Sequence, residues 1–117
     1  MHCARSAFGC SLSKKLQVLV VAGGQINASI ATNRCEIYDI RGDQWTEIPP
    51  MRDAKCSNSL CFKGDWVYAV GGLVRANCSV EMSNKIERLH LKNLNLGWQL
   101  LNVQLEEGGV DFGTVIR

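Results

Sequence analysis

Two apolar runs, each closed by a pair of glycines, set the pattern of this chain. The first run is VLVVA, Val18–Ala22, before Gly23-Gly24, and the second is WVYAV, Trp66–Val70, before Gly71-Gly72. Short apolar runs rich in β-branched residues are typical of strands that are buried on both faces. Glycine ends such a strand well, because it tolerates positive φ and close approach of another backbone. The pattern predicts two equivalent buried strands, 48 residues apart.

The residues that follow each glycine pair repeat the same order of features. We expect polar loops at 25–33 and 73–84, then strands at 34–40 and 85–91 that each contain a glutamate. Short strands at 45–48 and 98–103 follow, each beginning with a tryptophan, and Pro49-Pro50 ends the first of them. A short strand also precedes each apolar run. With the same offset of 48, Phe8 aligns with Cys56 and Leu12 with Leu60.

Four strands therefore fit into one period of about 50 residues, which is typical of propeller blades. In the last residues, Asp111 to Thr114 echo Ala7 to Cys10, so that a further repeat is expected to begin at 105–117. Both ends of the chain fall inside a repeat. We therefore favour a piece of a longer propeller over two alternatives, assembly with copies of itself and an open array.

These residues resemble the kelch repeat. Its pattern is an apolar strand ending in Gly-Gly, a Glu-x-Tyr-Asp strand, a Trp, and Pro-Met-x-x-x-Arg/Lys. The matching residues of the first copy, in order, are Gly23, Gly24, Glu36, Tyr38, Asp39, Trp45, Pro50, Met51 and Lys55. The second copy keeps Gly71, Gly72, Glu87 and Trp98. It departs from the pattern at Leu89 and His90, and no Pro-Met follows its tryptophan.

The resemblance implies an all-β fold of kelch-type β-propeller blades, each a four-stranded antiparallel sheet. A closed propeller needs at least four blades, so this chain is expected to form an incomplete propeller of a little over two. We assign 1–13 to the innermost strand of the first blade, 16–51 to its remainder, 54–104 to the second blade and 105–117 to the next. Trp45 and Trp98 should be equivalent wedges, each buried against a neighbouring blade, with no helix between them.

The amino-acid composition argues against several classes of function. Lys and Arg exceed Asp and Glu by only 13 to 11, and the charges are scattered. This argues against a nucleic-acid or membrane surface, which would need a concentrated basic stripe. The apolar run at 16–22 is better explained as a repeated strand than as part of a signal peptide. We therefore expect the six cysteines to be free thiols in a reducing compartment, and the protein to be cytoplasmic.

Candidate chemistry is sparse. His2 and His90 are the only histidines, and neither lies in a recognisable catalytic Cys/His signature. No Cys-x-x-Cys or His-x-x-x-His pair suggests zinc, and Gly-Gly lacks the spacing of a phosphate loop. Arg41-Gly42-Asp43 could be an adhesion tripeptide, but Gly-Asp is also ordinary hairpin-turn chemistry. We expect no catalytic residue, no metal and no cofactor.

The remaining function is recognition of a protein. In propellers that resemble this chain, the loops after Gly-Gly and those before the next blade commonly line one rim. The candidate partner-binding residues by that position are Gln25, Arg34, Arg52, Lys55 and Arg75. The alternative for each is a merely solvated loop residue. Other possibilities are a fragment of a propeller enzyme, similar to sugar oxidases or isomerases, and a self-assembling subunit; the partner could also be the remaining blades.

Overall fold

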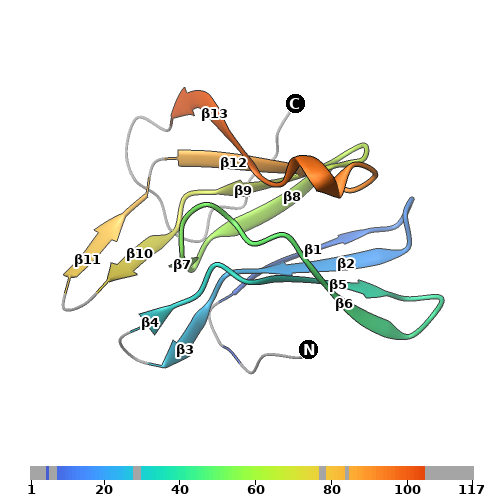
Figure 1. Cartoon of the computed structure of the whole chain (residues 1–117), viewed down its shortest axis with the longest axis horizontal. Coiled ribbons are helices and arrows are strands. Elements are labelled where there is room, and N and C mark those ends of the chain that lie inside the picture. The colour runs from blue at the N-terminus through green and yellow to red at the C-terminus, as the bar shows by residue number, and fades with distance from the viewer. Residues whose placement is uncertain (1–4, 6–7, 28–29, 77–78, 84, 105–117) are drawn as a thin grey trace.

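The computed structural model describes residues 5, 8–27, 30–76, 79–83 and 85–104. Two four-stranded antiparallel sheets dominate this part of the chain (Figure 1). The first sheet has the order β1 (Gly9–Ser13), β2 (Val18–Ala22), β5 (Cys35–Asp39) and β6 (Gln44–Ile48). The second has the order β8 (Ser59–Lys63), β9 (Trp66–Val70), β12 (Lys85–His90) and β13 (Gln99–Gln104). The all-β fold of four-stranded blades is confirmed.

The two sheets are built on the same register. In the first, Val21 pairs with Glu36, and in the second, Ala69 pairs with Glu87. Each glutamate lies on the third strand of its sheet, opposite the last but one residue of the strand that leads into Gly-Gly. Glu36 and Glu87 thus occupy equivalent positions in the two sheets as well as in the repeated sequence pattern.

The first strands of the two blades are not related by the offset of 48 residues that relates the second strands. Gly9 pairs with Ala22 and Ser59 with Val70, so the first strands are offset by 50 while the second strands are offset by 48. The reason is the turn between them, which comprises residues 14–17 in the first sheet and only 64–65 in the second. The alignment of Phe8 with Cys56 and of Leu12 with Leu60 is therefore wrong by two residues.

The core lies between the two sheets. Val20, Ala22 and Cys35 of the first sheet belong to one buried cluster with Val67 and Leu89 of the second. The sheets approach each other most closely along β1 and β8, which are the first strands of the two blades. This is the arrangement expected of neighbouring blades about an axis, because their inner strands converge.

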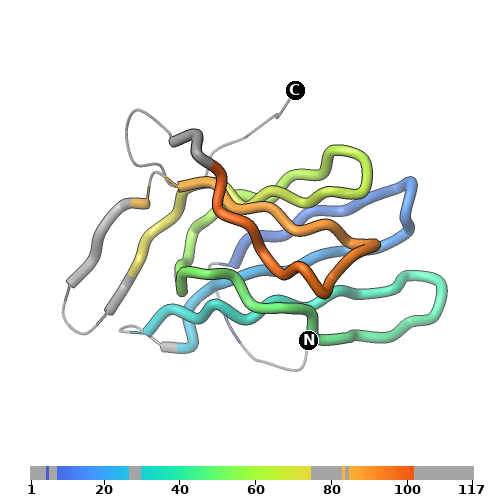
Figure 2. The backbone as a smooth tube through the Cα atoms, turned by 45° about the horizontal axis from the view of Figure 1, so that its top comes forward, coloured from blue at the N-terminus to red at the C-terminus, as the bar shows by residue number. Residues whose placement is uncertain are grey.

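Segment 49–58 runs between the sheets and joins them (Figure 2). It contains β7 (Lys55–Cys56), whereas the first strand of the second blade begins only at Ser59. Cys56 and Leu60, which were expected to share one short strand before the second apolar run, thus lie on two separate strands. Met51 donates its N–H to the Asn33 carbonyl over 2.9 Å, and the Asn33 amide donates to the Met51 carbonyl over 3.2 Å. These two bonds tie the start of the segment to the residues just before β5.

The two tryptophans occupy equivalent places but different surroundings. Trp45 pairs with Tyr38, and its ring lies 5.0 Å from the tyrosine ring on the face of the first sheet that points away from the second. Trp98 directly precedes β13, is buried between the sheets and donates its indole N–H to the Pro49 carbonyl over 2.8 Å. Only Trp98 is therefore a wedge between the described blades.

The longer connection in the second blade forms η1 (Leu94–Leu96), a single 3₁₀ turn. It lies between the two tryptophans, where no helix was expected, and it accommodates the extra residues between Glu87 and Trp98. No helix in the described part of the chain is long and apolar enough to cross a membrane. The predicted further repeat at 105–117 lies outside the described residues.

Candidate partner-binding rim

Two small hairpins stand at the end of the molecule where the Gly-Gly strands finish, on the left of Figure 1. They are β3 (Gln25–Asn27) with β4 (Ile30–Ala31), and β10 (Leu73–Ala76) with β11 (Ser79–Met82). The predicted loops at 25–33 and 73–84 are thus wrong as loops. Their arms are extended and pair through the backbone, which polar composition alone does not reveal. We call the two hairpins together with segment 49–58 the rim.

The glycine pairs fix both hairpins in the same way. Gly23 N–H donates to the Arg34 carbonyl over 3.0 Å, and Gly71 N–H donates to the Lys85 carbonyl over 3.2 Å. The second glycine of each pair accepts a hydrogen bond from the far arm, at 2.9 Å in the first blade and 2.8 Å in the second. All four glycines have positive φ, between 65° and 109°. The repeat signature therefore sets where the hairpins leave the blades.

The backbone of Lys55 connects the two hairpins. Its N–H donates to the Thr32 carbonyl over 3.3 Å, and its carbonyl accepts from the N–H of Gly24 over 2.9 Å. On the other side, β7 pairs with β10, with Cys56 opposite Leu73 and Lys55 opposite Val74. The rim is thus one hydrogen-bonded unit that spans both blades.

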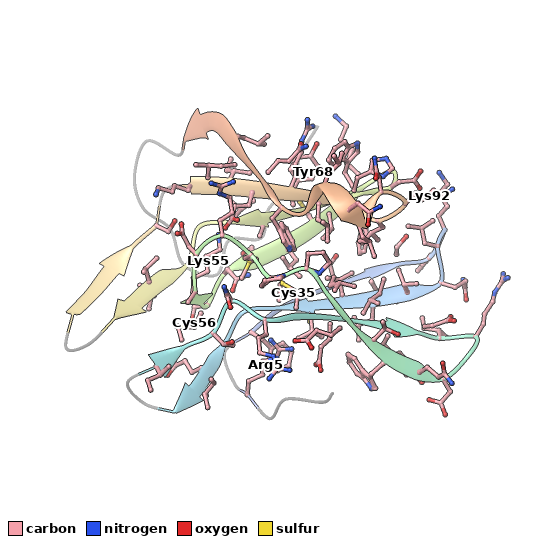
Figure 3. All side chains as sticks on the ribbon, viewed as in Figure 1. Arg5, Cys35, Lys55, Cys56, Tyr68 and Lys92 are labelled. Carbon is pink, nitrogen blue, oxygen red and sulfur yellow. The ribbon has the colours of Figure 1, made fainter. Side chains whose placement is uncertain are left out.

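The side chain of Lys55 lies inside this unit (Figure 3). Its ammonium is 3.1 Å from Glu87 Oε2, and both side chains have 0% exposure. Glu87 Oε1 also accepts the N–H of Arg52 over 2.7 Å. The first blade has a similar pair, with Arg5 2.9 Å from Glu36, again buried. Lys55 therefore has a structural role, and we remove it from the candidate partner-binding residues because no partner could reach it.

The other predicted rim residues are placed as follows. Gln25 lies half-buried on β3, and Arg52 is exposed on the segment between the blades. Arg34 is exposed and is paired with Glu47 at 2.8 Å. Arg75 stands on β10, but its side chain lies outside the described residues. The structure thus brings Gln25, Arg34 and Arg52 to the same end of the molecule.

Two apolar residues on the rim were not predicted. Ile26 and Ile30, on the two arms of the first hairpin, are 54% and 51% exposed. Two large apolar side chains with that exposure on one short hairpin favour contact with another molecule. The sequence does contain an indication of this apolar site, because two isoleucines interrupt an otherwise polar stretch.

The thiols and the metal-binding side chains give no sign of a reactive centre. Cys10, Cys35, Cys56 and Cys61, the described cysteines, are all free. Burial raises the pKa of the Cys35 thiol to about 12, so that it stays protonated and unreactive. Among the residues that the structure covers, no group of three or more His, Cys, Asp or Glu could hold a metal ion.

The tripeptide at 41–43 forms the turn between β5 and β6. Asp43 accepts a hydrogen bond from the Tyr38 hydroxyl, and this bond raises the pKa of the tyrosine. Asp43 also has a positive φ of 50°. The turn thus has a local structural explanation.

Comparison with known proteins agrees with this architecture. The family model for the Kelch motif matches residues 17–52, from the turn before β2 to the start of the segment between the blades. Residues 17–52 of this chain are a kelch repeat. Over 40 residues, the kelch-repeat chain is 45% identical to Kelch-like protein 7 of Homo sapiens and of Gallus gallus, which covers 34% of the chain and 7% of those proteins.

Other relatives match over longer stretches. An Influenza virus NS1A-binding protein homolog from Xenopus laevis is 33% identical over 72 residues, covering 62% of this chain and 11% of that protein. The F-box/kelch-repeat protein SKIP20 from Arabidopsis thaliana is 36% identical over 55 residues, covering 47% of the chain and 13% of its own length. The kelch-repeat chain thus spans only a small part of these relatives.

The solved structure of YjhT shows the same fold at low sequence similarity. It superposes with a TM-score of 0.75 and 12% identity, covering 91% of this chain and 30% of that one. At this identity the similarity establishes the arrangement of the strands and nothing about activity.

Proposed function

We propose that this chain is a protein-interaction scaffold that binds a partner through the rim and catalyses no reaction. The observation that carries the proposal is the exposed pair Ile26 and Ile30, mounted on a hairpin that the backbone of both blades holds in place. Recognition residues are commonly found on loops above a rigid scaffold. A pre-organised hairpin loses little entropy on binding, so apolar burial there contributes more fully to affinity.

The chemistry of the rim favours a partner that offers an apolar side chain. Much of the charge on the rim is already compensated, since Arg34 pairs with Glu47 and Lys85 lies 3.9 Å from Asp53. Arg52 adds an exposed guanidinium beside the hairpins. We expect the two isoleucines to supply most of the binding energy, and Arg52 to supply orientation.

A propeller enzyme is the competing class, and the composition of the inner strands is the observation that bears on it. Catalysis along the axis would need acid-base or metal-binding side chains on β1 and β8. The described residues there are Gly9, Ser11, Ser13 and Ser59 together with Cys, Leu, Phe and Lys side chains. This composition supports the scaffold over the enzyme.

The test is a comparison of three proteins: the wild-type chain, the double variant Ile26→Ser/Ile30→Ser, and the control Ile40→Ser. Ile40 is also an exposed isoleucine, but it lies at the other end of the molecule. Partners captured by the wild type are identified, purified and titrated against each protein by calorimetry. We expect the double variant to bind at least about tenfold more weakly, since it loses two apolar contacts. The control should bind with the affinity of the wild type. Equal affinity for all three proteins refutes the rim as the binding site.

A further inference from the structure

The end of the molecule opposite the rim concentrates lysine. Three connections meet there, β1–β2, β8–β9 and β12–β13, on the right of Figure 1. Lys14, Lys15 and Lys92 lie in these connections and Lys63 is the last residue of β8; we call the four residues the lysine patch. All four are exposed, and the side chains of Lys15 and Lys92 are 72% and 65% exposed. Figure 3 shows Lys92 at the end of the molecule away from Cys56 and the rim.

One carboxylate, that of Asp65, lies near two lysines of the patch. Asp65 Oδ1 lies 4.0 Å from the ammonium of Lys15, and Asp65 Oδ2 lies 3.8 Å from that of Lys92. The Asp65 carbonyl also accepts the N–H of Leu91 over 2.9 Å, which ties the β12–β13 connection to the β8–β9 turn. A single aspartate therefore gathers lysines from two connections at distances too long for close ion pairs.

The lysine patch is consequently far from neutral. Four lysines against one aspartate leave an excess of three positive charges, whereas the whole chain has a net charge of +2. The neighbouring β5–β6 turn adds Arg41, Asp39 and Asp43. Both of these carboxylates are engaged within their own turn, Asp39 by the N–H of Arg41 at 3.1 Å and Asp43 by the Tyr38 hydroxyl. Counting them still leaves this end positive.

The connection that carries Lys92 also carries an exposed leucine. Leu96, on η1, is 58% exposed, and η1 is held by the N–H of Gly97, which donates to the Leu94 carbonyl over 2.9 Å. A cationic cluster beside a fixed, exposed leucine is complementary to a chain segment that carries both carboxylates and an aliphatic side chain. We propose that the lysine patch is a second interaction surface and that it docks an acidic, leucine-containing protein segment.

The observations favour protein over nucleic acid. Stacking on single-stranded bases needs an open aromatic face. Trp66, which follows Asp65, is already covered by the guanidinium of Arg88 at 4.0 Å and by the ring of His90 at 4.6 Å. The patch itself contains lysines, which act as point charges, and no arginine that could bind bases bidentately.

The test uses the full chain and a labelled synthetic peptide of alternating Glu and Leu, with a Gln and Leu peptide as the uncharged probe. Binding is measured by fluorescence anisotropy at low and high NaCl. We expect the triple variant Lys15→Glu/Lys63→Glu/Lys92→Glu to bind the acidic peptide about tenfold more weakly, because three attractions become repulsions. Affinity of the wild type should fall as salt rises. Thermal unfolding of the variant confirms that it is folded.

The control is Arg52→Glu, a charge reversal on the rim, which should leave peptide affinity unchanged. It separates this surface from the proposed rim function, because a peptide that binds at the rim would respond to Arg52 and not to the lysines. The proposal is overturned if the triple variant binds as the wild type does, or if the Gln and Leu peptide binds as tightly. It is also overturned if single-stranded DNA, or vesicles containing phosphatidylserine, bind the wild type more tightly than the acidic peptide does.

Discussion

Replacing Lys55 by methionine should destabilise the protein strongly, although Lys55 is a charged residue. Methionine fills much of the same space but leaves the Glu87 carboxylate without its cation. Glu87 would keep one neutral donor, the N–H of Arg52 at 2.7 Å. Because neither side chain of the pair is exposed to water, solvent cannot replace the lost ammonium.

The size of the effect follows from this burial. Removing one partner of a buried ion pair costs about 3–5 kcal/mol, because the remaining charge stays desolvated. A chain of 117 residues is stable by about 6–18 kcal/mol at ordinary values per residue, so the loss is a large fraction of the total. With a urea slope of about 1.5 kcal/mol per molar, the unfolding midpoint should fall by about 2–3 M.

Two further variants make the measurement decisive. Lys15→Met removes an exposed ion pair of the same residue type, at 4.0 Å from Asp65, and should cost less than about 0.5 kcal/mol. Lys55→Met/Glu87→Gln removes both charges but keeps an oxygen that can accept from Arg52, and should recover the stability to within about 1–2 kcal/mol of the wild type. Far-ultraviolet circular dichroism during urea titration measures all of them. If Lys55→Met lowers the free energy of unfolding no more than Lys15→Met does, the Lys55–Glu87 pair is not buried between the blades in solution. The structural role assigned to Lys55 is then incorrect.

Other perturbations test separate parts of the structure. Gly23→Ala should lower the free energy of unfolding, measured by chemical denaturation, by about 2 kcal/mol more than Gly64→Ala does. Both glycines have positive φ, but only at Gly23 would a Cβ meet a backbone carbonyl of β7. Equal losses would contradict this close approach. Trp98→Ala should cost about 3–5 kcal/mol, since the indole is buried between the sheets, and a loss under about 1 kcal/mol would place it on the surface. At pH 8 a thiol reagent should modify Cys10 rapidly and Cys35 only as the protein unfolds. Because the Cys35 thiol ionises near 9.0 when unfolded and near 12 when folded, stability should also fall as the pH rises above about 9, and a flat profile there would argue against its burial.

The arrangement of the blades could be predicted from the sequence because it depends on features with strong local signals. The Gly-Gly pairs marked the ends of β2 and β9, and the repeated glutamate marked β5 and β12. The first strands were harder to align. One offset was applied to the whole repeat, but the turn at 14–17 is two residues longer than the turn at 64–65, and weakly patterned strands such as β1 contain nothing that reveals such a shift.

The candidate site could be predicted by its location but not by its chemistry. Lys55 is basic and stands before a blade, which favours a surface position, whereas its burial depends on Glu87, which lies on a strand 32 residues away. Ile26 and Ile30 were passed over because short hairpin arms within a polar stretch have no distinctive period. Long-range pairing of this kind leaves no trace in the local sequence pattern, and charged residues are in general found at the surface.

The way in which β7 joins its neighbours has a consequence for how the protein folds. Since the backbone of Lys55 is bonded to Thr32 and Gly24 on one side and pairs with β10 on the other, neither blade can open without breaking ladder bonds that also serve its neighbour. In repeat proteins, such nearest-neighbour coupling determines whether units melt singly or together. We therefore expect the amides of β2 and β9 to exchange with deuterium at similar rates, as parts of one cooperative unit rather than of two independent ones.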